Sequence, residues 1–181
     1  MKDQNPFKLK SSKPIYENPW IKVREDAVVR PGGQDGIFGV VEVKEGVAVA
    51  ALTSDNTLLM AREYKYGVGR FTLECIGGVI DEGEDHAKTA KRELKEEMGA
   101  VSNNWTYLGY TVSLPTILTF TENLYLAQDV EVVAPQNTDE GEVIEIVEVP
   151  FTEALEKITS GEIIHDTTIV AILRTHLLLN Q

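Results

Sequence analysis

Residues 77–100 read GGVIDEGEDHAKTAKRELKEEMGA, and this stretch decides the fold. Acidic turn formers at its start give way to helical periodicity, which predicts a helix over 85–98 that stops at Gly99. Ala90, Leu94 and Met98 fall on one narrow stripe of that helix. The stripe predicts that one side of the helix packs against an apolar core.

The acidic residues of this helix gather on one flank. Glu93 and Glu97 are four positions apart, and like charges at that spacing destabilise a helix by about 0.2–0.5 kcal/mol per pair. Carboxylates near a helix C-terminus also oppose the helix dipole. A divalent cation would offset both costs, and clustered carboxylates favour Mg²⁺ or Mn²⁺ over Zn²⁺. A solvated acidic face is the alternative.

Three further features support a metal site. Glu96 adds a third acid, and Arg92 lies one turn before it, where it can hold that carboxylate in a fixed orientation. The Gly77-Gly78 turn would let a backbone carbonyl approach the same ion. The sequence therefore predicts metal ligands at Gly77, Glu93, Glu96 and Glu97, with Arg92 and Glu97 among the catalytic residues.

The spacing of these residues resembles the signature of the Nudix hydrolases, G-x5-E-x7-R-E-U-x-E-E-x-G-U, where U is a large apolar residue. Only the last position, Ala100, departs from the pattern, because alanine is small. The segment Gly78–Ala100 is called the box from here on. The resemblance implies an α+β fold, the Nudix α/β/α sandwich with mixed sheets, and metal-dependent attack of water on a substituted nucleoside diphosphate.

Features outside the box resemble the ADP-ribose pyrophosphatase and nucleoside diphosphate sugar hydrolase branch of that family. Arg62, in the run REYKY, matches an Arg-bearing strand end of that branch. Glu74, in LECIGG, matches an acidic residue just before the box, and Pro115 stands where the branch places a proline. The resemblance implies that these three residues contact the substrate.

A second acidic segment, Asp139–Glu142, precedes a strand-like run at 143–149. An equivalent loop in the branch supplies a late metal ligand and the base. The resemblance therefore implies that Glu142 binds metal and that Glu140 is a catalytic base, a role that a box glutamate would otherwise fill. A polar surface loop is the alternative for this segment.

The first part of the chain is strand-like. A mobile lead-in is expected over 1–13, then short strands at 20–24, 27–30 and 37–43, the last two joined by a glycine-rich turn. The resemblance implies two domains: an N-terminal antiparallel strand arm, 1–43, that pairs two subunits and contacts the base, and a Nudix hydrolase domain, 44–181.

Within that arm, three residues are candidates for substrate contacts. Tyr16 or Trp20 would stack on the nucleobase, and Arg30 would contact phosphate. Packing in a dimer or in the core is the alternative for the aromatic residues. The chain is expected to close with two helices, over 152–160 and 166–179, the second capped by Asp166.

Composition limits the other classes of function. The 181 residues, 43% of them apolar, suffice for one main domain with a core, and 17 Lys+Arg against 29 Asp+Glu give a net charge of −12. Such a surface disfavours nucleic acid and anionic membranes as partners. No targeting segment or membrane-spanning run is visible, and a lone cysteine, Cys75, excludes an intrachain disulfide and favours the cytoplasm.

Together these features predict a homodimeric enzyme that cleaves the pyrophosphate bond of nucleoside diphosphate sugars such as ADP-ribose or GDP-mannose. The products would be a nucleoside monophosphate and a sugar phosphate, with two to three Mg²⁺ or Mn²⁺ ions per site. Hydrolysis of nucleoside triphosphates or dinucleoside polyphosphates is the alternative. A non-catalytic nucleotide-sugar sensor is less favoured, because the box retains Glu84, Glu93, Glu96 and Glu97.

Overall fold

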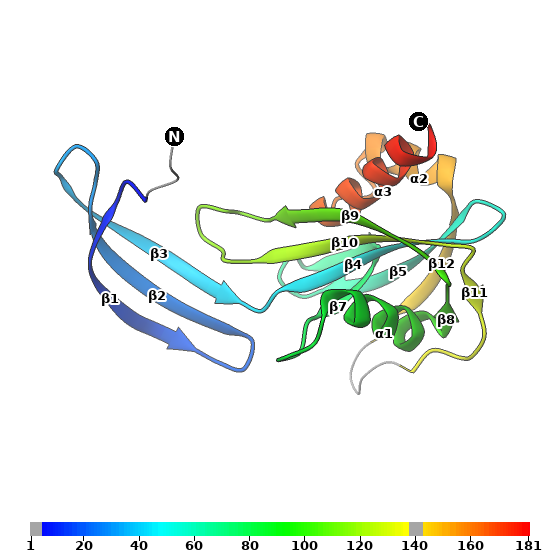
Figure 1. Ribbon diagram of the computed structural model, residues 1–181, viewed down its shortest axis with the longest axis horizontal. Helices are drawn as coiled ribbons and strands as arrows, with labels where there is room; N and C mark the ends of the chain where they lie inside the picture. The colour runs from blue at the N-terminus through cyan, green and yellow to red at the C-terminus, as the bar shows by residue number, and fades with distance from the viewer. Residues whose placement is uncertain (1–4, 138–142) are drawn as a thin grey trace. The chain divides into compact units, whose positions relative to one another are not determined.

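The computed structural model describes residues 5–137 and 143–181, and it divides into two compact units (Figure 1). The first unit holds the N-terminal strands together with the segment Val112–Thr121. The second unit holds Glu45–Thr111 and Glu122–Gln181, which include the box. Each unit is described in turn.

A mixed sheet of seven strands forms the centre of the second unit. Five of them lie in the order β12-β5-β4-β10-β9, in which β10 is parallel to β4 and β5 is antiparallel to both β4 and β12. Off this path, β6 pairs with β5 and β7 pairs with β4. The seven strands are β4 (Gly46–Leu52), β5 (Thr57–Lys65), β6 (Arg70–Glu74), β7 (Ile76–Val79), β9 (Asn104–Val112), β10 (Thr121–Gln128) and β12 (Glu145–Pro150).

Helices cover both faces of this sheet. α1 (His86–Met98) packs on one face, and α2 (Phe151–Ser160) and α3 (Asp166–Leu179) pack on the other. The alternation along β5 shows the two faces: Leu59 and Ala61 join the α1 cluster, whereas Leu58 and Met60 join the α2 and α3 cluster. This layered arrangement of mixed sheet and helices confirms the predicted fold class.

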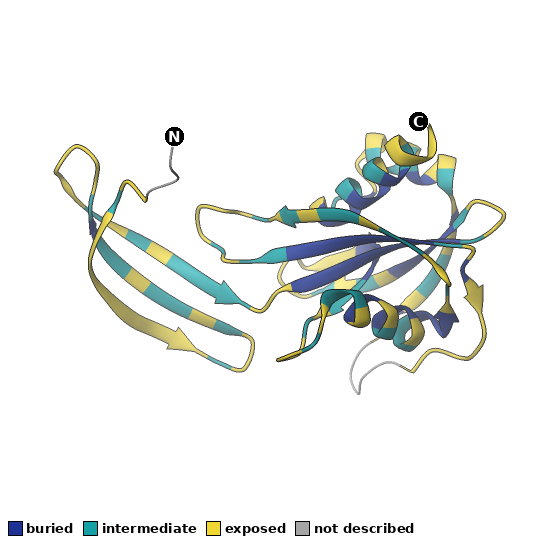
Figure 2. Ribbon diagram, viewed as in Figure 1, coloured by how far each residue is buried: buried dark blue, intermediate teal, exposed yellow. Residues whose placement is uncertain are grey.

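The strands at the centre of the sheet are apolar along their whole length. Every residue of β4 is buried, and the interior of β10 is buried as well, as the dark blue ribbons of Figure 2 show. A strand covered on both faces needs apolar side chains in both directions, which explains the continuous run GVAVAAL. A small pair of strands, β8 (Ala100–Val101) and β11 (Glu131–Val132), follows α1 and β10.

The predicted bounds of α1 are correct to within one residue. Asp85 caps the helix, its carboxylate accepting from the Ala87 N–H at 3.0 Å, and Gly99 ends it in the left-handed region with φ of 59°. For α3 the predicted cap is wrong. His165 is the N-cap, because its carbonyl already accepts from the Ile169 N–H at 3.0 Å and Asp166 is helical.

The first unit is an antiparallel sheet of three strands, β1 (Lys8–Glu17), β2 (Ile21–Val29) and β3 (Asp35–Val43), in that order. The expectation of a mobile lead-in is wrong from Lys8 onward, because β1 pairs with β2 along its length. β2 is one continuous strand rather than two, since it is hydrogen-bonded on both sides and Arg24 neutralises Asp26 within it at 3.1 Å.

The segment Val112–Thr121 lies along the outer edge of β3. The Val41 N–H donates to the Ile117 carbonyl at 2.8 Å, and the Thr119 N–H donates to the Val41 carbonyl at 3.1 Å. These two bonds explain why the segment groups with the N-terminal strands. Among the described residues of this unit only Val28 is buried.

Candidate active site

The acidic flank of α1 lies against the two glycines of β7. A Cβ atom on Gly78 would fall on the Glu93 carboxylate, and one on Gly77 would come within 2.5 Å of the Val47 carbonyl oxygen. Glycine is therefore required at Gly77, where the neighbour is backbone, and at Gly78 a side chain would displace the Glu93 carboxylate. The glycines let β7 pass between β4 and the nearly buried Glu93 side chain.

Arg92 draws three acids of the box together. Its Nη1 lies 2.8 Å from both Glu93 Oε1 and Glu96 Oε2. Its Nε and Nη2 donate to Glu84 at 3.3 and 3.2 Å, and Nη2 also donates to the Val79 carbonyl at 3.3 Å. The hydrogen bond from Arg92 lowers the pKa of Glu84 below its usual value. Arg92 thus holds Glu96 as the spacing predicted, and it ties both α1 and β7 to Glu84.

The donor set fits a hard divalent cation. Glu93, Glu96 and Glu97 lie on one side of a single helix, and the cradle at Gly78 fixes one of their carboxylates. Clustered carboxylate oxygens suit Mg²⁺ or Mn²⁺. Among the described residues no three His, Cys, Asp or Glu side chains already converge on one point that would hold a metal ion, because Arg92 gathers the acids around itself.

Two predicted site residues, Glu140 and Glu142, lie outside the described residues. The chain just before them contacts the end of α1. The Asn137 N–H donates to the Glu96 carbonyl at 2.7 Å, and the Val133 and Ala134 N–H groups donate to the Gly99 carbonyl. The residues that precede the acidic segment are therefore anchored next to the box.

The structure does not bring Arg62 together with the box. Arg62 has the same orientation as Leu58 and Met60, so its side chain lies on the face that α2 and α3 cover. There it binds Glu145 at 2.8 Å, and its guanidinium lies 4.2 Å from the centre of the Phe71 ring.

Glu74 lies at the end of β6, where it is buried. The Thr72 hydroxyl donates to its carboxylate at 2.6 Å, and Lys65 Nζ and His165 Nδ1 lie at 3.6 and 3.4 Å. Its strand partner is Ala61, which packs under α1. Glu74 is thus on a strand that leads directly into the box.

The remaining predicted contacts belong to the first unit. Tyr16 and Trp20 lie at the turn between β1 and β2 and are 54% and 76% exposed. Arg30 is exposed beside the turn between β2 and β3, and Pro115 is exposed in the segment Val112–Thr121. Both aromatic rings have free area on which a planar ligand could stack.

His86, the first residue of α1, is half-buried in an aromatic cluster. Its Nδ1 bonds the Tyr125 hydroxyl, and its ring stacks on Tyr107 with centroids 5.4 Å apart. Burial raises the pKa of Tyr125 to about 12. The cluster depends on the pairing of distant strands, so no local signal in the sequence indicates it.

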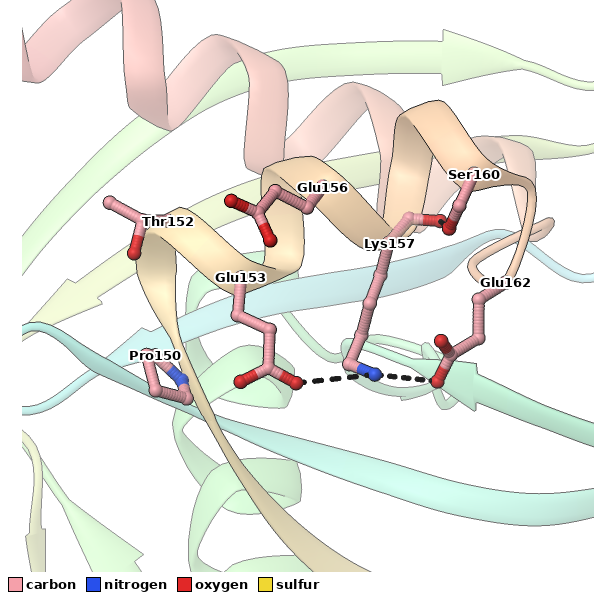
Figure 3. A pocket seen from close by; sticks show the side chains of 7 residues that line it. All are labelled: Pro150, Thr152, Glu153, Glu156, Lys157, Ser160 and Glu162. Atoms are coloured by element: carbon pink, nitrogen blue, oxygen red, sulfur yellow. Dashed lines mark hydrogen bonds and ion pairs between the residues drawn. The ribbon is translucent and has the colours of Figure 1, made fainter.

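A groove of about 640 Å³ runs along α2, on the face of the sheet opposite α1 (Figure 3). Lys157 lies in it between Glu153 at 3.2 Å and Glu162 at 2.7 Å. Because both flanking acids neutralise Lys157, the described residues that line this groove offer no free cation to an anionic substrate. The residues that line it are Pro150, Thr152, Glu153, Glu156, Lys157, Ser160 and Glu162.

Two family models match the chain: the nucleoside diphosphate sugar hydrolase N-terminal domain over residues 7–41 and the NUDIX domain over residues 44–169. An ADP-ribose pyrophosphatase of Mycobacterium tuberculosis is 29% identical over 175 residues, which cover 96% of this chain and 84% of the relative. A methanol dehydrogenase activator of Bacillus methanolicus is 29% identical over 161 residues, 87% of this chain and 86% of the relative.

A solved structure, the crystal structure of an ADP compounds hydrolase, superimposes with a TM-score of 0.88 over 99% of this chain and 97% of its own. Its sequence identity is 22%, so this likeness establishes the shared fold. No helix in the described ranges is long and apolar enough to cross a membrane.

Proposed function

The chain belongs to the Nudix hydrolase family, and from that premise we propose that it hydrolyses the pyrophosphate bond of nucleoside diphosphate sugars, ADP-ribose first and GDP-mannose second. The observation that carries the proposal is the complete set of box acids, with Glu93 cradled at Gly78 and Glu96 held by Arg92. The match of residues 7–41 to the N-terminal domain of nucleoside diphosphate sugar hydrolases supports the substrate class.

Divalent metal ions are part of this proposal. Glu93, Glu96, Glu97, the Gly77 carbonyl and Glu142 would hold two to three Mg²⁺ or Mn²⁺ ions. Bound there, such ions neutralise charge on the phosphate oxygens and lower the pKa of a water molecule. They also reconcile a net charge of −12 with an anionic substrate.

The side chains of the protein orient the metal-binding carboxylates and accept a proton from water. Arg92 keeps Glu93 and Glu96 in place, and Glu84 in turn fixes Arg92. Glu140 or Glu97 takes a proton from the attacking water as a general base. The water oxygen bonds to one phosphorus, the bond from that phosphorus to the bridging oxygen breaks, and a nucleoside monophosphate and a sugar phosphate leave.

We assign two roles to the N-terminal strand arm: it contacts the nucleobase of the substrate, and it contacts the second subunit. Tyr16 or Trp20 would stack on the nucleobase, with Arg30, Glu74 and Pro115 contacting the rest of the substrate, whereas Arg62 is left out because its side chain lies on the face opposite the box. A three-stranded sheet with one buried residue is marginal on its own, which supports pairing with the arm of a second copy in a homodimer. The single cysteine, buried and reduced, supports a cytoplasmic location.

A product assay tests the proposal. Purified protein with Mg²⁺ is incubated with ADP-ribose, GDP-mannose, ATP and a diadenosine polyphosphate, and the products are separated by chromatography. We expect monophosphate from the first two substrates and none after chelation of the metal. Activity on ATP or the dinucleotide alone would assign the chain to another Nudix activity, and tight binding without cleavage would favour a sensor.

A further inference from the structure

The strand that leads into the box changes partners at Cys75. β6 pairs with β5 up to Glu74, and β7 pairs with β4 from Ile76 onward. Cys75 is the single residue between them, so its N–H has no strand partner. That N–H donates instead to the Thr168 hydroxyl at 2.9 Å, in the first turn of α3. This crossover is called the Cys75 crossover below.

We propose that Thr168 is a positioning residue for the metal-binding acids of α1, acting through the Cys75 crossover and the glycines of β7. The inference rests on the proposed function, because it concerns the same metal site. In this proposal Thr168 contacts neither the substrate nor the metal. It fixes the backbone that the Glu93 carboxylate rests on.

The hydroxyl of Thr168 links two backbone segments. It accepts from the Cys75 N–H at 2.9 Å and shares a hydrogen bond with His165 Nδ1 at 3.0 Å. Thr168 has no exposed surface and Cys75 is 7% exposed, so water does not compete for these bonds. A buried N–H that loses its acceptor is costly, and the crossover would shift to recover one.

Only a few residues separate the Cys75 crossover from the acids of α1, so a shift of the crossover is transmitted to them. Gly77 and Gly78 follow two and three residues later, and both are held in register with β4. Gly77 already lies so close to the Val47 carbonyl that a Cβ atom would clash, and the Glu93 carboxylate rests on Gly78. Movement of the crossover therefore moves the Gly78 backbone against which the Glu93 carboxylate packs.

The same helix supplies a matched control. Thr175 is as fully buried as Thr168, but its hydroxyl has no hydrogen-bond partner within the described part of the chain. Thr168→Val and Thr175→Val make the same exchange of hydroxyl for methyl, and only the first removes a bond to the crossover. Thr168→Ser keeps the hydroxyl and serves as the rescue variant.

The test measures Mn²⁺ affinity of the full chain by electron paramagnetic resonance, at a temperature where every variant is folded. Thr168→Val is expected to weaken Mn²⁺ binding several-fold, below the roughly 10-fold loss that follows removal of a direct partner of a metal ligand, because Thr168 acts through the intervening backbone. The Mg²⁺ concentration for half-maximal turnover should rise in parallel. Thr168→Ser and Thr175→Val should bind as the unaltered protein does.

Wild-type Mn²⁺ affinity in Thr168→Val, with only the melting temperature lowered, would overturn the proposal, as would equal weakening in Thr175→Val. If Thr168→Val does not fold, Thr168→Ala replaces it, because alanine removes the hydroxyl without placing a methyl against Cys75. The same weakening is expected. A protein that binds Mn²⁺ in this pattern but cleaves no nucleotide sugar refutes the proposed function and leaves the positioning role standing.

Discussion

The two sheets of this protein bury their residues in opposite ways. Every residue of β4, in the seven-stranded sheet, is buried, whereas every residue of β1, in the three-stranded sheet, is exposed. Helices cover both faces of the seven-stranded sheet, and none of the described residues of the unit that holds the three-stranded sheet is in a helix. The apolar strands of the larger unit are therefore accounted for by the core that they form with its helices. In the smaller unit Tyr16 and Trp20 are exposed and leave area to which a ligand or a partner could bind.

The largest expected effect separates chemistry from folding in the larger unit. Glu97→Gln should lower kcat by more than about 100-fold, because losing even an outer partner of a metal ligand costs about 10–100-fold. The melting temperature should stay unchanged. Glu25→Gln, at an exposed position of β2 in the smaller unit, is the control and should leave turnover intact. A folded, fully active Glu97→Gln protein would show that the box acids are assigned wrongly.

The sequence could predict what local signals determine. The bounds of α1 follow from Asp85 and Gly99, which cap the helix through bonds to residues within one or two turns. The bond from Arg92 to Glu96 follows from helical spacing. The signature in the box predicted the Nudix family, and the matched NUDIX domain confirms it.

What the sequence did not show depends on pairing between distant segments. The run 71–76 changes strand partners at Cys75, and the hydroxyl that accepts the Cys75 N–H lies 93 residues away. β1 was missed because its sequence, KLKSSKPIYE, is polar and is held by pairing with β2 rather than by burial. Arg62 appeared beside the box along the chain, yet the alternation of β5 turns it to the other face.

The second prediction measures the contrast in burial directly. Leu94→Ala, under α1, should lower the free energy of unfolding by about 2–5 kcal/mol, because it empties a fully buried site. Leu9→Ala makes the same change on β1, where the side chain is 63% exposed, and should cost no more than about 0.5 kcal/mol. Urea denaturation of both variants tests this. A similar cost at Leu9 would mean that a partner covers this part of β1 in solution.

The third prediction asks what the exposed aromatic residues are for. Trp20→Ala should raise KM roughly 10-fold and leave kcat little changed, because stacking of a base on an aromatic ring contributes about 1–3 kcal/mol. Stability should not change, since the ring is 76% exposed. Tyr66→Ala, whose ring is 94% exposed in the other unit, is the matched control and should leave KM unaltered. Equal effects from the two variants would remove the proposed role of the arm in binding.

The smallest expected effect concerns an exception within the larger unit, a buried carboxylate. Glu122 is 8% exposed, and its Oε2 accepts from the Thr167 hydroxyl at 2.6 Å. Burial raises the pKa of Glu122 above its usual value, and the nearby Asp166 and Glu74 add to this, while the Thr167 bond and His165 oppose it. Ionisation of Glu122 therefore destabilises the folded chain and has no such penalty in the unfolded chain.

The direction of the pH dependence follows from that raised pKa. The unfolded chain loses this proton at about pH 4.5, whereas the folded chain keeps it up to its own, higher pKa. Between these two pH values the folded state binds more protons than the unfolded state. Raising the pH through this window thus removes stability. Glu122→Gln cannot ionise and still accepts from Thr167, so the difference between its free energy of unfolding and that of the unaltered protein should grow in its favour as the pH rises through this window. Denaturation of both proteins across pH 4.5–7 measures the gain. A constant difference across that range, like the one expected for the exposed Glu25→Gln, would show that Glu122 is solvated and that the interior of the larger unit is less closed than its burial indicates.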